Sequence, residues 1–133
     1  MKLKIKVIIL PVITLVLQVL PFGAVCNFAS PDGDSIRKTF SYFSPVPFGY
    51  ANFSPLLTGI FTVFTFGTLL IYLFFKRRRS LIYAEFLTWI SFGLSLCPLW
   101  YGIRFFSVTG FFITITLLVK AIIIHTILSK KEN

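Results

Sequence analysis

The chain has 133 residues, of which 56% are hydrophobic and only 13% are charged, and its formal net charge is +9. A soluble domain of this size buries only about two-thirds of its surface and carries about 25% charged residues, so it could not hide this much apolar side chain. Intrinsic disorder is excluded as well, because disordered chains have low hydrophobicity. The composition therefore predicts an integral membrane protein.

Four apolar stretches are long enough to cross a bilayer, since a hydrocarbon core of about 30 Å needs roughly 20 helical residues. They are residues 5–25, 55–75, 80–100 and 105–128. We expect a single integral membrane domain over residues 1–133, an all-α antiparallel bundle of four transmembrane helices. The alternative for the first stretch is a signal peptide cleaved near Cys26, but its apolar part is longer than the usual 7–15 residues.

The distribution of lysine and arginine predicts the orientation, because cytoplasmic loops are enriched in these residues. Nine basic residues lie on one predicted side: Lys2, Lys4, Lys6, Lys76, Arg77, Arg78, Arg79, Lys130 and Lys131. Three lie on the other: Arg37, Lys38 and Arg104. We therefore expect a multi-pass plasma-membrane protein with both termini in the cytoplasm. The positive charge then records orientation and anionic lipid contact, not a nucleic-acid surface.

The one long connection, the outer loop of residues 26–54, is rich in aromatic side chains. Its second part contains Phe40, Tyr42, Phe43, Phe48, Tyr50 and Phe53. A turn is expected at residues 31–33, whereas Pro45 and Pro47 argue against a regular helix. Alternation from Phe40 onward would suit a short strand, but an isolated strand pair is unstable. The loop is interpreted either as a cover on the mouth of the bundle, with interfacial aromatics, or as a lid or partner-binding surface.

Three segments in the first half of the chain are similar to segments of other small membrane proteins. They are Leu20-Pro-Phe-Gly, Asn27-Phe-Ala-Ser-Pro-Asp-Gly and Ser41-Tyr-Phe-Ser-Pro-Val-Pro-Phe-Gly-Tyr-Ala-Asn-Phe-Ser-Pro. In these segments the chain resembles uncharacterised small four-span membrane proteins of Gram-positive bacteria. The resemblance implies a bacterial plasma membrane, and no function transfers with it.

Three ionisable side chains lie inside the predicted spans: Glu85, Lys120 and His125. An ionisable group costs about 2.5–3.5 kcal/mol or more at the membrane centre, so each is a functional candidate. If the last two spans form a hairpin that turns near residues 102–104, Glu85 lies opposite a point close to Lys120. We expect an intramembrane Glu85–Lys120 ion pair with His125 nearby. The alternatives are separate snorkelling to the interface and a proton or ion relay.

Hydroxyl side chains form a stripe on each of the last three spans. The stripes contain Thr58, Thr62 and Thr65, then Thr88, Ser91 and Ser95, then Thr109 and Thr116. Small and hydroxyl side chains let helices approach closely in lipid and bond across the contact. We therefore expect these stripes to face other helices and interpret them as packing surfaces rather than a substrate path.

The two cysteines, Cys26 and Cys97, are expected at the outer ends of the first and third spans. Because this is the oxidising side, a disulfide between them is one interpretation, and two buried, inert thiols are the other. The sequence contains no paired-cysteine motif, metal-ligand spacing or nucleotide-binding loop. We expect no catalytic residues, no metal and no cofactor.

These patterns favour a non-enzymatic accessory or interaction protein of the plasma membrane. Its expected contacts are the lipid bilayer and other membrane proteins or further copies of itself, with no nucleic acid. The alternative is a small oligomeric transporter that uses Glu85 and Lys120 as coupling residues. A membrane enzyme is less favoured, because no catalytic constellation is visible.

Overall fold

The computed structural model describes residues 2–130, with side chains from residue 5 onward, and it is mostly helical. Three helices are long and apolar enough to cross a membrane: α3 (Ser54–Phe75), α4 (Arg78–Trp100) and α5 (Val108–Lys130). Each lies within three residues of the bounds predicted from sequence. The described chain is therefore a helical bundle in which three long apolar helices pack together.

The first helix, α1 (Lys2–Val19), ends six residues before the predicted end at residue 25. Its apolar part, Ile5–Val19, spans about 22 Å at 1.5 Å per residue, which is less than a bilayer core of about 30 Å. The helix ends here because Pro21 disfavours helical geometry at Leu20 and provides no backbone N–H of its own. The apolar residues that follow belong to a strand instead.

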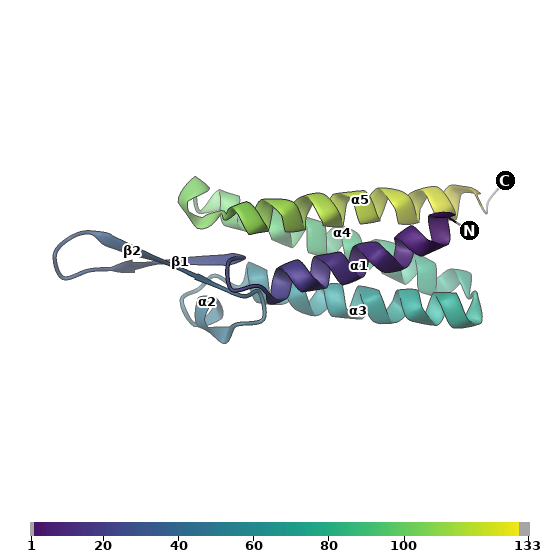
Figure 1. Ribbon diagram of the computed structural model, residues 1–133, viewed down its shortest axis with the longest axis horizontal. Coiled ribbons are helices and arrows are strands. Elements are labelled where there is room, and N and C mark those ends of the chain that lie inside the picture. Colours follow the sequence, from purple (N-terminus) through teal and green to yellow (C-terminus); the bar gives the residue numbers. More distant parts are fainter. Residues whose placement is uncertain (1, 131–133) are drawn as a thin grey trace.

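The helices α1, α3, α4 and α5 lie side by side, and the two ends of the described chain lie at the same end of the bundle (Figure 1). α1 packs against α3 and α5, and α4 packs against the same two helices. The buried face of α1 carries Val7, Pro11, Thr14 and Gln18, at spacings of four, three and four residues that keep them on one helix face. α1 is thus a full member of the bundle despite its shorter apolar length.

The predicted hydroxyl stripes of α3 and α4 face the interior. Thr58, Thr62, Thr65, Thr88, Ser91 and Ser95 are all at most 1% exposed. Apolar clusters fill the two ends of the bundle, one around Leu69, Leu81 and Ile124 and the other around Tyr42, Ile113 and Leu117. The small hydroxyl residues therefore form the close helix contacts between these clusters, and many of the Phe and Ile side chains of the helices face outward.

Residues 24–40 form a β-hairpin at the end of the bundle opposite the chain ends (Figure 1). β1 (Ala24–Ala29) pairs with β2 (Ser35–Phe40) in antiparallel register, from Ala24 opposite Phe40 to Ala29 opposite Ser35. The predicted turn lies between the strands, with Gly33 at φ 87°, a conformation that favours glycine. The hairpin was not predicted from sequence, because the residues of β1 continue the first apolar stretch without a break.

A short helix, α2 (Pro45–Gly49), follows the hairpin, so the expectation that the prolines prevent helix formation is wrong. Pro45 occupies the first helical turn, where its missing N–H removes no helical hydrogen bond. The Ser44 Oγ accepts a hydrogen bond from the Val46 backbone N–H at 3.3 Å and caps the helix. A 3₁₀ turn, η1 (Ile103–Phe105), connects α4 to α5 at the same end of the bundle.

Candidate functional site

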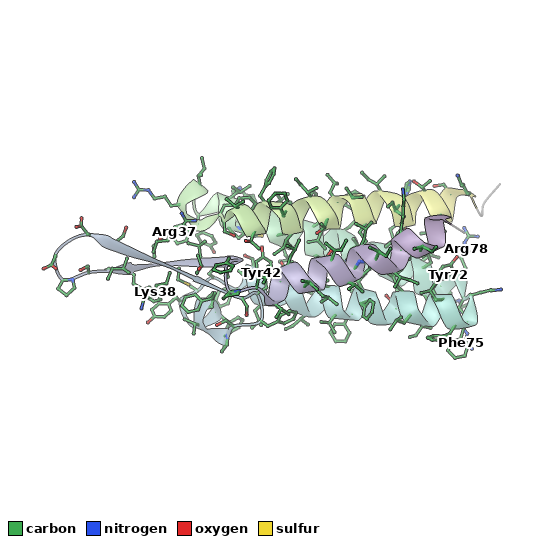
Figure 2. The ribbon with its side chains drawn as sticks, viewed as in Figure 1. Arg37, Lys38, Tyr42, Tyr72, Phe75 and Arg78 are labelled. Atoms are coloured by element: carbon green, nitrogen blue, oxygen red, sulfur yellow. The ribbon has the colours of Figure 1, made fainter. Side chains whose placement is uncertain are left out.

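Tyr42 anchors the outer loop in the mouth of the bundle. Its side chain is only 2% exposed, and its backbone N–H donates to the carbonyl oxygen of Gln18 at 2.9 Å. Gly23 lies so close that a Cβ there would be 2.8 Å from the Tyr42 ring, and a Cβ at Gly110 would be 3.4 Å from its hydroxyl. Figure 2 shows Tyr42 where the hairpin meets the helices. Burial raises the pKa of Tyr42 well above its ordinary value.

The other predicted loop aromatics divide into an inner and an outer set. Phe40 and Phe43 are half-buried, and the Phe43 ring lies against Gly59 of α3. Phe48, Tyr50 and Phe53 are exposed, but they are not isolated. The Phe48 and Phe53 rings meet edge to face at 4.8 Å, and the Tyr50 ring meets the Phe28 ring of β1 at the same distance. The segment of residues 41–53, here called the collar, is therefore folded onto the bundle and the hairpin base.

Side-chain hydrogen bonds tie the base of the hairpin to the segments that lead into α3 and α5. The Ser107 Oγ donates to the carbonyl of Gly23 at 2.6 Å, and the Asn52 Nδ2 donates to the carbonyl of Val25 at 3.3 Å. The first half of β1 is buried as a result, whereas every residue of β2 except Phe40 is exposed. The hairpin thus has a fixed base and an exposed outer strand.

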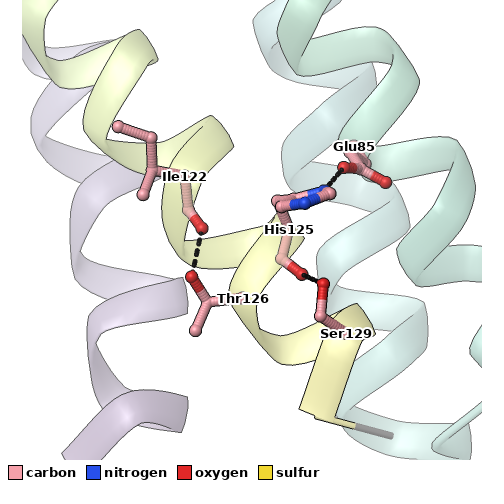
Figure 3. A network of polar contacts seen from close by, with 5 residues as sticks. All are labelled: Glu85, Ile122, His125, Thr126 and Ser129. Carbon is pink, nitrogen blue, oxygen red and sulfur yellow. Dashed lines mark hydrogen bonds and ion pairs between the residues drawn. The ribbon is translucent and has the colours of Figure 1, made fainter. Parts of the chain in front are cut away.

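The three ionisable residues of the spans do not meet as predicted. Glu85 contacts His125, whose Nδ1 lies 2.7 Å from the Glu85 Oε1 (Figure 3). The His125 side chain is 66% exposed and that of Glu85 is 21% exposed, so this contact lies on the outside of the α4–α5 pair. Lys120 points elsewhere: it is 1% exposed, and its Nζ has no hydrogen-bond partner.

The register of α4 against α5 sets the level of Lys120 along the bundle. Thr114 donates to the Ser95 Oγ at 3.1 Å, and this contact together with the Glu85–His125 pair fixes the register. Lys120 lies between the two contacts and therefore level with Thr88 and Ser91 of α4. Both hydroxyls donate to carbonyls of their own helix, at 2.6 and 2.9 Å. The Lys120 ammonium group is therefore buried in the bundle, and Glu85, the carboxylate predicted to pair with it, contacts His125 instead.

Polar contacts of α1 were missed in the sequence. The Gln18 Nε2 donates to the Thr62 Oγ1 at 3.0 Å, while the Gln18 Oε1 is buried without a partner. The Thr14 Oγ1 and the Thr116 Oγ1 lie 3.2 Å apart across the α1–α5 contact. Gln18 could have been noticed as the one amide side chain within the first apolar stretch. These contacts identify the inward face of α1, which apolar composition alone could not.

The two cysteines are free thiols rather than a disulfide. Cys26 lies in β1 and is buried, and this burial raises the pKa of its thiol. Cys97 lies in α4 and is half-exposed in a shallow surface pocket of about 430 Å³ that Gly93, Leu96 and Trp100 also line. Across the described residues, no group of three His, Cys, Asp or Glu side chains is arranged to hold a metal ion.

Comparison with known proteins gives no match: no family model, curated protein or solved structure corresponds to this chain. The resemblance to small four-span proteins of Gram-positive bacteria, drawn from segments of the first predicted span and the outer loop, therefore stays a prediction. Function has to be argued from the hairpin, the collar and the polar interior.

Proposed function

We propose that this protein is a non-enzymatic accessory protein of the plasma membrane that presents its β-hairpin to a protein partner outside the cell. The observation that supports this most directly is the exposed second strand of a hairpin that extends beyond the helix ends (Figure 1). Both termini lie in the cytoplasm in this proposal, as the distribution of basic residues predicts.

The exposed strand β2 offers an edge to which a strand of another protein could be added. An isolated two-stranded sheet is marginally stable in water, and an exposed strand edge is a template for pairing with another chain. Among the described residues, β1 is the only strand that pairs with β2. Ile36, the second residue of β2, lies opposite Phe28 near the turn of the hairpin and is 49% exposed. Strand addition by a partner would cover this apolar side chain and satisfy the free edge.

Contacts at the base of the hairpin pre-order its strands for binding a partner. Tyr42, Asn52 and Ser107 hold the ends of the two strands against the bundle. A partner would therefore meet a largely pre-ordered strand and would lose less conformational entropy on binding.

The test compares two exposed isoleucines at the same end of the molecule. Partners are captured from intact cells by a photo-crosslinking residue at position 35 and identified after purification in mild detergent. Ile36→Asp should abolish the crosslinked product, whereas Ile103→Asp, in η1 with 84% exposure, should leave it intact. Equal capture by the wild type and Ile36→Asp would contradict the proposal.

Orientation is tested separately by thiol labelling. In a variant whose native cysteines are replaced by alanine, Ser35→Cys should react with a membrane-impermeant maleimide in intact cells. Ser129→Cys, exposed near the end of α5, should react only after the membrane is opened. Labelling of position 129 from outside would reverse the proposed orientation.

A transporter remains the second candidate, because a fully buried and unpartnered lysine within a span is a feature of coupling sites. In purified proteoliposomes, loss of pH-dependent flux in Glu85→Gln or Lys120→Met, without any loss of thermal stability, would favour transport. Binding of a partner to the hairpin that persists in both variants would favour the accessory role.

A further inference from the structure

The end of the bundle opposite the hairpin carries consecutive arginines at the turn between α3 and α4. α3 ends at Phe75, Lys76 adopts the left-handed conformation with φ 51°, and α4 begins at Arg78. Arg77, Arg78 and Arg79 together line one concave surface pocket of about 360 Å³. Figure 2 shows Arg78 and Phe75 at this end. Three guanidinium side chains thus border the same small volume.

The electrostatics of this turn favour an anion. The first turn of α4 contains no acidic residue, and Arg77 at the N-cap position makes no side-chain capping bond. The backbone N–H groups of a helix start carry partial positive charge, which adds to that of the arginines. The one carboxylate of α4, Glu85, lies about 9 Å beyond Arg79 along the helix axis and contacts His125.

The position of the pocket selects a lipid anion over a dissolved one. Phe74 and Phe75, the last residues of α3, are 79% and 68% exposed, and the Arg77 guanidinium lies 5.8 Å from the centre of the Phe75 ring. Exposed aromatic residues at the end of an apolar helix mark the depth of the lipid headgroups. A ligand in the pocket could place its acyl chains beside these rings while its phosphate contacts the arginines.

We propose that Arg77, Arg78 and Arg79 form a binding site for the phosphate of an anionic phospholipid headgroup. The orientation of the chain requires only positive charge at this turn, and lysine would supply it equally well. Arginine provides in addition a planar fork of donors that matches two phosphate oxygens at once. The site is independent of the hairpin and of any partner outside the cell.

The experiment measures lipid binding to the purified full chain in a non-ionic detergent by native mass spectrometry. One molecule of phosphatidylglycerol should stay bound to each protein chain in the mass spectrum, at lipid concentrations at which zwitterionic phosphatidylcholine does not stay bound. Equal retention of the two lipids would overturn the proposal. Displacement of phosphatidylglycerol by millimolar inorganic phosphate or glycerol 3-phosphate would instead identify a site for a dissolved anion, which also overturns it.

Two triple variants separate charge from geometry. Replacing Arg77, Arg78 and Arg79 by lysine keeps the net charge and should weaken binding by about tenfold. Replacing all three by glutamine should weaken it by on the order of 100-fold, roughly fivefold for each lost cation near the membrane surface. The matched control, Arg37→Lys with Arg104→Lys, changes the remaining two arginines at the other end and should bind within about twofold of the wild type. Wild-type affinity in the lysine triple variant, or an equal loss in the control, would refute a built phosphate site.

Discussion

Lys120 provides the sharpest test of the bundle interior, because the structure encloses its ammonium group without giving it a partner. The side chain is 1% exposed and the Nζ makes no hydrogen bond. Lys120→Met preserves most of the unbranched stem and removes the charge. No hydrogen bond is lost in this substitution, so the whole effect should come from removing the penalty of a buried charge.

The expected gain follows from the cost of a central lysine in a membrane helix, about 2.5–3.5 kcal/mol. Effective burial penalties in proteins are also several kcal/mol per ion, so we expect Lys120→Met to increase the free energy of unfolding by about 3 kcal/mol. For a chain of this size that corresponds to a rise in melting temperature of roughly 10 °C.

The assay is thermal unfolding in mild detergent, followed by circular dichroism. Lys130→Met is the matched control, since Lys130 is exposed at the end of the same helix and should change the melting temperature by less than about 2 °C. A lower melting temperature for Lys120→Met would refute the reasoning, because it would mean that the ammonium group has a stabilising partner in the folded protein.

Three further predictions concern the loop and the helix contacts. The free energy of unfolding of Gly59→Ala should be about 1 kcal/mol lower than that of Gly67→Ala. The reason is that a Cβ at residue 59 would lie 3.0 Å from the Phe43 ring, whereas one at residue 67 meets nothing within 4 Å. Equal thermal stability of the two variants would contradict the docking of the collar. N-ethylmaleimide should modify Cys97 well before Cys26 at pH 8, since Cys26 is buried and its pKa is raised, and mass spectrometry that finds Cys26 modified first would contradict this. Because burial raises the pKa of Tyr42, the folded state favours the neutral phenol, and the corresponding stability is complete below about pH 10 and lost as the pH rises further. The melting temperature of the wild type should therefore fall more steeply above pH 10 than that of Tyr42→Phe. Parallel profiles of the two proteins would show that residue 42 is not the titrating group.

The three long helices could be predicted from composition because each is an uninterrupted apolar stretch bounded by basic or turn-forming residues. Length and hydrophobicity are local properties, so α3, α4 and α5 need no knowledge of their neighbours. The end of α1 could not be placed in the same way, because apolar residues continue past Val19 into β1. Only the pairing with Ser35–Phe40 decides that this continuation is a strand.

The pairing of Glu85 shows how far the contacts of the candidate site could be predicted from the sequence. A hairpin of two helices places Glu85 at a level where both Lys120 and His125 are within reach along the axis. These two residues lie about 140° apart around α5, at 100° per residue, so only one of them can face Glu85. Packing of α5 against α1 and α4 sets its rotation, which directs Lys120 inward and His125 outward.

The sequence alone therefore determined that this is a membrane-type chain with long apolar helices, inward hydroxyl stripes and basic residues gathered at the helix ends. These properties follow from residue type and helical spacing. The tertiary structure decided which polar groups meet, how the collar is docked through Tyr42, and that residues 24–40 form a hairpin. Such features depend on contacts between segments far apart in the chain, whose relative rotation and distance no local pattern encodes.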